Sequence, residues 1–440
     1  MGYHDIYKSC QDNPEAYWLE QSKAIDWEEA PRQALFDKGN DLYEWFADAK
    51  VNACYNAVDR HVENGRADQV AIIHDSPITD TQTKITFAEL QTRVAAVAGA
   101  LQANGVGKGD RVIIYMPMVP EALEAMLACA RIGAVHSVVF GGFASNELAV
   151  RINDCTPKAI IAASCGLEPA RVVAYKPLLD GAIEQADHKP DFCLILQREQ
   201  APCDLTPGRD LDWHAAQKGT TPAPCVAVEG NHPAYILYTS GTTGAPKGVV
   251  RQTAGHLVAL NWTMKNIYNV DPGDVFWAAS DVGWVVGHSY ICYGPLVHGN
   301  TTVVFEGKPV GTPDAGTFWR VISEHNVRSF FTAPTAIRAV KREDPKGEEI
   351  GKYDISCLRA LYLAGERADP DTVIWAQEKL GIPVYDHWWQ TETGYTIVGN
   401  PAGLEALPVK VGSPTVPMPG YDVQILNEAG EPQPAGTLGS

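Results

Sequence analysis

The residues best suited to chemistry lie in a short loop rich in glycine and hydroxyl groups. The stretch 239–248 contains four Ser or Thr hydroxyls, three glycines and Lys247, and it follows the apolar stretch 234–238. Glycine lets the backbone approach a ligand closely, hydroxyls donate hydrogen bonds, and lysine supplies a positive charge. This composition indicates a loop that binds phosphate oxygens, although a flexible surface loop can have a similar composition.

The spacing within this loop excludes the Walker type of phosphate-binding loop. A Walker loop has four residues between its two glycines, and Lys followed by Ser or Thr comes directly after the second. Here only two residues separate Gly241 from Gly244, and Gly248 rather than a hydroxyl residue follows Lys247. A different class of phosphate-binding loop is therefore required.

A second group of reactive residues lies in the segment 388–394, which reads Trp-Trp-Gln-Thr-Glu-Thr-Gly. Glu392 is the only acid of this segment. Its carboxylate is the type of ligand that Mg²⁺ prefers. Trp388 and Trp389 cannot both face the same side of an extended chain, so they must contact different surroundings. An exposed loop glutamate and a core pair of tryptophans are the simpler alternatives.

Alternating strands and helices must position these segments. Strand patterns occur at 70–74, 111–116, 135–140, 159–163, 234–238, 301–305, 329–332, 360–363 and 383–385. Helical patterns occur at 86–105, 120–133 and 145–154. Thr86 and Glu89 form a capping box at the start of the first helix, and Pro120 suits the first position of the second. Strands alternating with helices of about 10 to 15 residues predict an α/β fold with parallel sheets.

Changes in amino-acid composition and in strand and helix patterns along the chain also suggest its domain organisation. Residues 1–64 are rich in Trp, Tyr and acidic side chains and predict a helical extension packed on the body. The body, 65–440, is expected to contain two α/β lobes at about 65–230 and 231–400. From 401 to 440, prolines bracket short alternating stretches such as 421–426, which predicts a small β-barrel that is incomplete.

Composition and charge exclude several classes of partner. The chain has 35 Lys and Arg against 53 Asp and Glu, a formal charge of −18, which disfavours nucleic acid and anionic membranes. No apolar run reaches the roughly 18 residues of a membrane helix, and the N-terminus lacks a signal-peptide pattern. The ten cysteines include no Cys-x-x-Cys pair, which is typical of reduced, mostly buried thiols. We therefore expect a cytoplasmic protein.

The loop 239–248 resembles the signature loop of the adenylate-forming, or AMP-binding, superfamily. From Tyr17 onward the chain is similar to the acetyl- and propionyl-CoA synthetase branch of that superfamily. Further motifs carry the resemblance in the same order, at 139–143, 281–288 and 388–394. The segments 364–367 and 164–166 read closer to the propionyl branch. The resemblance implies the large N-terminal domain of these enzymes, with two α/β lobes of parallel type and the start of a small β-barrel.

The reaction that this resemblance implies has two steps. ATP activates a short-chain carboxylate, propionate with acetate as the weaker substrate, to an acyl-adenylate and pyrophosphate. CoA then displaces AMP, and Mg²⁺ is the implied cofactor. The alternatives are an acetyl-CoA synthetase of the same branch, a peptide-synthetase adenylation domain and a non-catalytic nucleotide-binding fragment. The Trp388–Trp389 pair and the lack of an Asp that would bind an amino group argue against the peptide-synthetase alternative.

The resemblance also assigns roles to individual residues. Glu392 would bind Mg²⁺, Thr391 would donate to the α-phosphate, and Lys247 would hold the β- and γ-phosphates, so these are the expected catalytic residues. The nucleotide-binding residues would be Thr239, Ser240, Gly241, Thr242, Thr243, Gly244, Lys247, Gly365, Glu366, Arg367, Asp386, His387, Trp388, Trp389, Gln390 and Thr391. The acyl pocket would consist of Trp284, Val285, Val286, Ala364 and Trp389. The CoA-binding residues would be Phe140, Gly141, Gly142 and Arg171. The acetyl branch has a further arginine where this chain has Glu168.

Enzymes of this branch continue well beyond the position of residue 440. The further part holds an Asp that binds the ribose hydroxyls, a hinge, and a mobile C-terminal domain with a catalytic lysine. The resemblance therefore implies that a C-terminal domain in cis is a partner, and that the 440 residues alone are inactive or weak.

Overall fold

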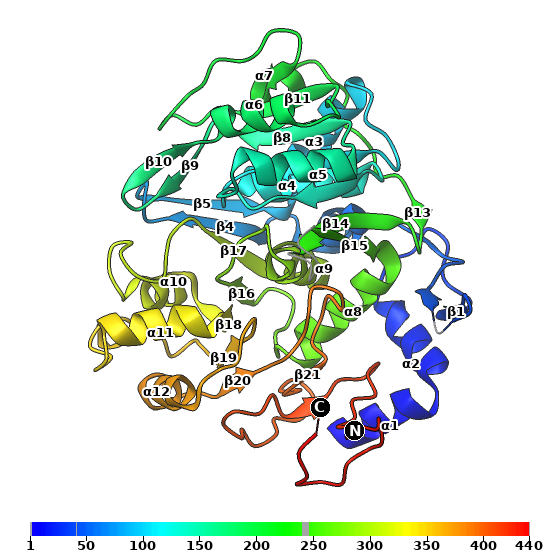
Figure 1. Ribbon diagram of the computed structural model, residues 1–440, viewed down its shortest axis with the longest axis vertical. Helices are drawn as coiled ribbons and strands as arrows, with labels where there is room; N and C mark the ends of the chain where they lie inside the picture. Colours follow the sequence, from blue (N-terminus) through cyan, green and yellow to red (C-terminus); the bar gives the residue numbers. More distant parts are fainter. Residues whose placement is uncertain (1, 41, 240–245, 440) are drawn as a thin grey trace.

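Two seven-stranded sheets form the body of the molecule (Figure 1). The computed structural model describes residues 2–40, 42–239 and 246–439. The first sheet has the order β12 (Asp210–Asp212), β11 (Phe192–Leu196), β8 (Ala159–Ala163), β6 (Arg111–Tyr115), β7 (Val135–Val138), β14 (Pro233–Thr239) and β15 (Lys247–Gln252). The second has the order β20 (Val384–Asp386), β19 (Ala360–Leu363), β18 (Val327–Thr332), β16 (Val275–Ala278), β17 (Thr301–Phe305), β4 (Val70–Ser76) and β5 (Thr81–Thr86). Neighbouring strands are parallel, except for the antiparallel edge pairs β14–β15 and β4–β5.

Helices connect the strands and cover the sheets. Those that accompany the first sheet are α3 (Phe87–Ala103), α4 (Pro120–Arg131), α5 (Ser145–Cys155), α6 (Tyr175–Gln185) and α7 (Trp213–Gln217). Those that follow along the chain are α8 (Thr253–Asn266), η4 (Gly287–Tyr293), α9 (Gly294–His298), α10 (Thr317–His325), α11 (Pro334–Glu343), η5 (Ile350–Lys352) and α12 (Pro370–Leu380). None of the helices in the described part of the chain is both long enough and apolar enough to cross a bilayer.

The predicted α/β alternation is confirmed, and the local signals explain where several elements begin. Thr86 Oγ1 accepts a hydrogen bond from the Glu89 N–H, and the Glu89 carboxylate accepts one from the Thr86 N–H, so the capping box starts α3. Pro120 is the first residue of α4, where its missing N–H leaves no helical bond unmade. Local chemistry therefore sets these boundaries.

The two sheets do not divide the chain at residue 230, where the sequence patterns placed the boundary between lobes at 65–230 and 231–400. The hairpin β4–β5 opens the α/β region but belongs to the second sheet, where Ile72 of β4 pairs with Thr302 of β17. Conversely, β14 and β15 follow residue 230 but complete the first sheet, where Tyr235 pairs with His136. A strand pattern shows that a segment is extended and buried, whereas the sheet it joins depends on partners far away in sequence.

The N-terminal segment is only partly helical. It begins with α1 (Tyr3–Asp12), α2 (Pro14–Gln21) and η1 (Ser22–Ala24) and ends with η2 (Tyr55–Asp59) and η3 (Val62–Arg66). Between them lie the short strands β1 (Leu35–Asp37), β2 (Tyr43–Trp45) and β3 (Lys50–Val51). Strand β3 pairs with β13 (Val228–Glu229), so the segment is packed on the body, as predicted, but through a sheet as well as through helices.

The predicted small β-barrel is not formed by residues 401–439. Their strand content is β22 (Val416–Pro417), paired with β21 (Val398–Gly399), and an isolated bridge between Leu426 and Pro432. The stretch 421–426 forms no strand. Proline lacks the N–H that a sheet ladder needs, and the prolines that bracket these stretches limit their pairing. The Tyr3 hydroxyl donates to the Pro417 carbonyl at 2.7 Å, so α1 lies against this region, and Figure 1 shows the two chain ends side by side.

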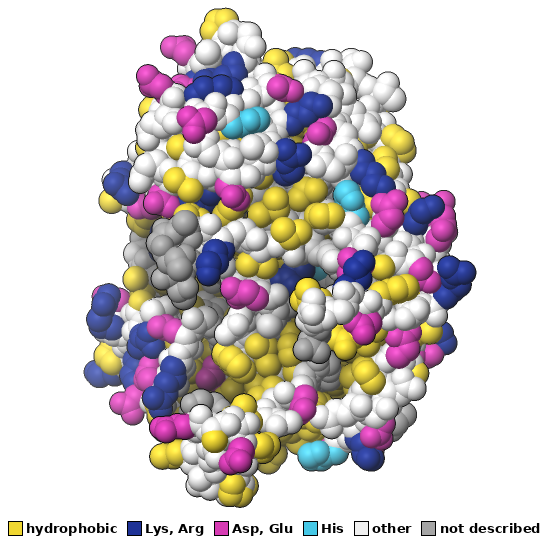
Figure 2. Space-filling model, turned by 45° about the vertical axis from the view of Figure 1, so that its right-hand side comes forward, with side chains coloured by type: hydrophobic (Ala, Val, Ile, Leu, Met, Phe, Trp, Pro, Cys, Tyr) yellow, Lys and Arg dark blue, Asp and Glu magenta, His cyan; other side chains and the backbone are white. Residues whose placement is uncertain are grey.

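One large hydrophobic core joins both sheets. It includes Leu90 of α3, Leu123 of α4, Leu257 of α8, Tyr290 of η4 and Tyr362 of β19. On the face turned forward in Figure 2, hydrophobic side chains gather in the central part, and charged side chains lie mostly around them. Segments from both sheets can therefore contribute to one site.

Candidate functional site

The hairpin formed by β14 and β15 presents the predicted phosphate-binding loop. Thr239 is the last residue of β14, Lys247 is the first residue of β15, and the two are paired across the ladder. The Lys247 side chain is exposed to solvent. The predicted residues Ser240, Gly241, Thr242, Thr243 and Gly244 lie outside the described residues. The hairpin thus places Thr239 and Lys247 at the base of the loop, on the edge of the first sheet.

Arg251 of β15 holds the loop that carries Thr391 and Glu392. Its Nη2 donates to the Thr391 carbonyl at 2.5 Å, and its Nη1 donates to the Glu392 carbonyl at 3.0 Å. Its Nε donates to the Tyr235 hydroxyl at 3.3 Å. A guanidinium presents several N–H donors in a fixed plane and can therefore bind two adjacent carbonyls at once. The loop 391–394 is consequently tied to the strand that begins at Lys247.

Gly394 is required by the closeness of this contact. Its φ is +75°, and a Cβ added there would lie 2.7 Å from Arg251 Cζ. The Gly394 carbonyl accepts a hydrogen bond of 2.8 Å from the Ser289 hydroxyl of η4. A side chain at this position would push the guanidinium away from the loop, so glycine preserves the anchor.

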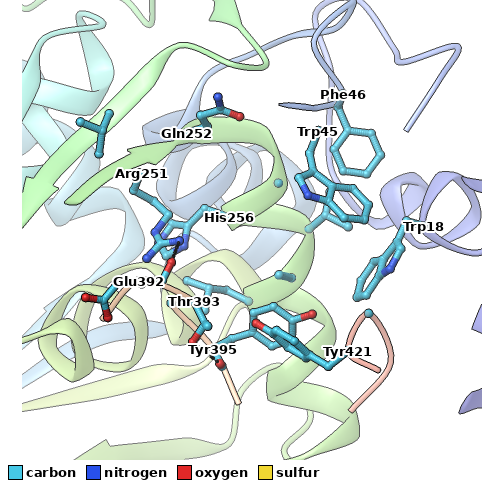
Figure 3. Close-up of a pocket in the computed structure, with 17 residues that line it drawn as sticks. Trp18, Trp45, Phe46, Arg251, Gln252, His256, Glu392, Thr393, Tyr395 and Tyr421 are labelled. Carbon is cyan, nitrogen blue, oxygen red and sulfur yellow. Dashed lines mark hydrogen bonds between the residues drawn. The ribbon is translucent and has the colours of Figure 1, made fainter. Parts of the chain in front are cut away.

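A cavity of about 380 Å³ lies beside this anchor (Figure 3). Arg251, His256, Glu392 and Tyr395 line one part of it, and Trp18, Trp45 and Phe46 of the N-terminal segment line another. In Figure 3 the Glu392 carboxylate points away from these aromatic rings. The N-terminal segment therefore forms an apolar wall next to the loop rather than a contact with the carboxylate.

The residues predicted to bind adenine follow two neighbouring strands. Leu363, the last residue of β19, pairs with Asp386, the last residue of β20, so the segment 365–367 and Asp386 leave the sheet at the same edge. Gly365 has φ +102°, a conformation that favours glycine. Burial raises the pKa of the Asp386 carboxyl to about 6, although the backbone N–H groups of His387 and Ala368 oppose this shift. The sheet thus brings the predicted adenine contacts together.

Two of these residues have partners of their own. The exposed Glu366 accepts a hydrogen bond of 2.6 Å from Arg338 of α11, which orients its carboxylate. Arg367 beside it is exposed. His387 is buried, and its Nδ1 and Nε2 lie 2.6 Å from the Leu363 carbonyl and 3.0 Å from the Tyr268 hydroxyl. Burial lowers the pKa of His387 to about 4. With both ring nitrogens engaged in the core, the side chain has no group left for a nucleotide.

The two adjacent tryptophans differ in exposure, as their opposite orientations predict. Trp388 is 46% exposed and Trp389 is 9% exposed. The Trp389 ring meets Tyr290 of η4 edge-on with centroids 5.4 Å apart. Its Nε1 is buried, and no described residue accepts a hydrogen bond from it. Gln390, the next residue, is exposed, and its carbonyl accepts a hydrogen bond from the Thr393 hydroxyl.

Four of the five predicted acyl-pocket residues belong to the main hydrophobic core or pack against it, and Trp284 differs from them. Ala364 and Trp389 are buried in the main core, and Val285 and Val286 pack against it. Trp284 is 51% exposed and instead faces Phe140, with ring centroids 5.8 Å apart. A tight turn, in which Gly283 N–H donates to the Asp281 carboxylate, precedes Trp284 at the surface. Trp284 therefore lies at the surface beside Phe140.

A second cavity, of about 630 Å³, brings together all the residues predicted to bind CoA. Phe140, Gly141, Gly142 and Arg171 line it, and Trp284 lines it as well. Arg171 of β10 (Arg171–Ala174) pairs with Glu168 of β9 (Cys165–Glu168), with Nε and Oε2 3.6 Å apart. At this exposed position Glu168 neutralises part of the charge that a phosphate would meet, where the acetyl branch has an arginine.

Sequence reasoning missed Arg251 and Ser289. An arginine directly after two valines, four residues after Lys247, was a usable signal for Arg251. No local signal pointed to Ser289, because its partner is distant in sequence.

Comparisons with known proteins agree with this geometry. The pattern described as "AMP-binding enzyme" matches residues 58–440, and the pattern described as "Acetyl-coenzyme A synthetase N-terminus" matches residues 3–57. The chain is 54% identical over 440 residues to an uncharacterised protein of Pseudomonas aeruginosa. This match covers all of this chain and 70% of that protein. It is 51% identical over 443 residues to the mitochondrial acyl-CoA synthetase short-chain family member 3 of Rattus norvegicus, covering all of this chain and 64% of that protein.

The name of a third relative includes a substrate. The chain is 45% identical over 435 residues to the propionate–CoA ligase of Escherichia coli, covering 98% of this chain and 69% of that protein. The chain thus spans 64–70% of the length of these relatives. Because the family pattern covers most of the sequence and these relatives match along its whole length, the chain belongs to the AMP-binding enzyme family, in the group of the short-chain acyl-CoA synthetases.

Proposed function

We propose that this chain is the nucleotide- and acyl-binding part of an ATP-dependent carboxylate–CoA ligase that acts on propionate and, less well, on acetate. The observation that carries the proposal is the anchor formed by Arg251, which ties the loop of Thr391 and Glu392 to the hairpin of Thr239 and Lys247. The name of the Escherichia coli relative supports the substrate class.

The reaction requires a carboxylate oxygen to become a leaving group. Attack of the carboxylate on the α-phosphate of ATP yields the acyl-adenylate and pyrophosphate, and the CoA sulfur then displaces AMP. Negative charge spreads over phosphate oxygens in the first step, so positioned donors and cations supply most of the catalysis. Thr391 donates to the α-phosphate, while Thr239, Lys247 and the intervening loop hold the β- and γ-phosphates.

The chemistry of Glu392 fits a magnesium ion. Its side chain is exposed, and no described residue forms a hydrogen bond or ion pair with its carboxylate. Mg²⁺ usually keeps several waters and takes one or two carboxylates together with substrate phosphates. Glu392 would hold the ion, which neutralises phosphate charge when bound. The backbone carbonyl of the same residue accepts a hydrogen bond from Arg251, which holds the backbone that carries this side chain.

Nucleotide binding and acyl-CoA formation by the 440 residues test the proposal. We expect calorimetry to detect ATP binding that requires Mg²⁺, and we expect acyl-CoA formation far below that of the Escherichia coli ligase assayed in parallel. The low turnover is expected because the relatives contain further residues that would complete the site. Absence of any ATP binding by the folded chain would refute the proposed function, and rapid acyl-CoA formation would refute the need for those residues.

Replacement of Ala364 by valine is expected to shift the preference from propionate toward acetate. Ala364 is buried in the main core, as Trp389 is, and the acetyl branch that the chain resembles has valine at this position. One methylene in an apolar pocket is worth about 1–3 kcal/mol of discrimination, so the ratio of kcat/KM for the two acids should change about tenfold or more. Both acids are assayed with both forms of a protein of the relatives' length. An unchanged ratio would mean that other residues determine the preference for the length of the carboxylic acid.

Nucleoside binding is expected to weaken on acidification through the titration of Asp386. Burial raises the pKa of this carboxyl to about 6, and the ionised form accepts the hydrogen bond of the adenine amino group. Affinity for adenosine, which has no phosphate that titrates, should fall about tenfold between pH 7 and pH 5. Protonation of a carboxyl whose pKa is raised favours the folded state, so this group does not cause unfolding over that range.

The matched variant for this experiment is Asp386→Asn, whose amide oxygen accepts a hydrogen bond at every pH. Its affinity for adenosine should stay nearly constant between pH 7 and pH 5. An equally steep pH dependence in the variant would assign the titration to another group.

A further inference from the structure

Two cysteines from distant parts of the chain face each other beside a buried ion pair. Cys54 lies at the start of η2, and Cys225 lies in the stretch 221–227, which has no regular secondary structure. Their sulfur atoms and a carboxylate oxygen of Asp59 all lie within 4.8 Å of one another. Cys54 is fully buried, whereas Cys225 is partly exposed.

The backbone explains why these two residues meet. In the antiparallel pair β3–β13, Val51 lies opposite Val228. Cys54 comes three residues after Val51, and Cys225 comes three residues before Val228. Because the two segments run antiparallel, both cysteines lie at the same distance from this paired position. Asn52 Nδ2 donates to the Val226 carbonyl at 2.7 Å and keeps the two segments together between these points.

Arg131 supplies a positive charge to this cluster. Its Nη1 lies 2.7 Å from Asp59 Oδ2 and 3.6 Å from Cys54 Sγ, and its Nη2 lies 3.1 Å from Asp59 Oδ1. Its Nε donates to the Ala223 carbonyl at 2.6 Å, next to the stretch that carries Cys225. The cation beside Cys54 Sγ favours the thiolate of that residue, which is the form that reacts with oxidants. The Cys225 thiol instead donates to Asp59 Oδ2 at 3.6 Å, and its hydrogen bond with Cys54 together with burial raises its pKa, which suits it to act as the second thiol.

We propose that Cys54 and Cys225 form a site of reversible oxidation, in which a peroxide converts the two thiols into a disulfide between the N-terminal segment and the stretch before β13. The thiolate of one cysteine attacks a peroxide oxygen, which gives a sulfenic acid and one molecule of water. The second thiol attacks the sulfenic sulfur, the S–S bond forms, and a second water leaves. The thiol pair loses two hydrogens and two electrons, and hydrogen peroxide is reduced to two waters.

The bond would join parts of the chain that now depend on non-covalent contacts. It would close a long loop, from the N-terminal segment to the stretch that leads into β14. Restricting a long loop in the unfolded chain raises stability. Asp59 keeps its two hydrogen bonds from Arg131 when the thiols are consumed, so the ion pair remains satisfied. This site is independent of the proposed ligase activity.

Mass spectrometry of the native 440-residue protein tests the proposal. The reduced protein is treated with hydrogen peroxide, remaining thiols are alkylated, and peptides are compared with and without dithiothreitol. We expect a cross-linked peptide pair containing Cys54 and Cys225, lost on reduction, while Cys357, another partly exposed cysteine, is recovered alkylated. Separate recovery of Cys54 and Cys225 as alkylated or over-oxidised peptides would overturn the proposal. Cross-links of equal yield among other cysteines would overturn it as well.

Thermal unfolding supplies a second readout that does not depend on peptide recovery. Peroxide should raise the melting temperature of the wild-type protein and of Cys357→Ser, and it should not raise that of Cys225→Ser. An equal rise in Cys225→Ser would contradict the assignment. Zinc that copurifies with the protein and protects these thiols from alkylation would also contradict it, in favour of a metal site built from Cys54, Asp59 and Cys225.

Discussion

Replacement of Glu392 by glutamine should reduce adenylate formation about a hundredfold or more, because it removes the carboxylate proposed to hold Mg²⁺ beside the phosphates. Glutamine has the same size, and the backbone carbonyl of residue 392 remains on Arg251, so the loop should keep its conformation. Pyrophosphate exchange is measured over a range of magnesium concentrations in a protein of the relatives' length that contains this sequence.

The matched control for this variant is Glu348→Gln, which also removes one exposed carboxylate. Among the described residues, the Glu348 side chain pairs with the solvent-exposed Lys346 alone, and Glu348 lies outside the proposed site. Its exchange rate should equal that of the unmodified protein. If Glu392→Gln shows normal exchange with normal magnesium dependence, Glu392 is not the metal ligand.

Replacement of Arg251 by lysine should impair adenylation although it retains the positive charge. Lysine offers a single ammonium group, which cannot bind the carbonyls of Thr391 and Glu392 together with the Tyr235 hydroxyl in the same plane. We expect a loss of about ten- to a hundredfold in pyrophosphate exchange, since a small displacement of a catalytic group costs up to about a hundredfold. Each lost charge-assisted bond should lower the free energy of unfolding by about 1.5–3 kcal/mol.

A positioning role for Arg251 predicts more than a loss of stability. The magnesium concentration for half-maximal exchange should rise in Arg251→Lys, because the loop no longer holds Glu392 in place. Arg342→Lys is the control, since Arg342 is highly exposed and, within the part of the chain that the structure describes, its side chain pairs with the neighbouring Glu343 alone. A loss of stability without a change in magnesium dependence would mean that Arg251 stabilises the fold but does not position Glu392.

Short-range chemistry in the sequence was sufficient to predict many elements of the α/β body, but not the short strands of the N-terminal segment or the irregular stretch 421–426. The Thr86–Glu89 capping box and Pro120 start their helices where the patterns indicate. The strand pattern at 301–305 coincides with β17, and that at 360–363 coincides with β19. These features depend on residues within one or two turns of each other, so a single sequence contains all the information needed. The motifs that mark the AMP-binding family are equally local.

The assembly of the site required contacts between distant residues. Arg251 binds Thr391 across 140 positions, and Ser289 binds Gly394 across 105, so no window of sequence shows either bond. Contacts between distant residues also pair β4 with β17 and turn Trp284 toward Phe140. Such contacts likewise engage both ring nitrogens of His387 in the core. The sequence alone indicated many strands and helices of the α/β body and the loops that carry reactive side chains. The tertiary structure decided which of them meet, because sheet order and core packing are selected by the whole chain burying its apolar surface at once.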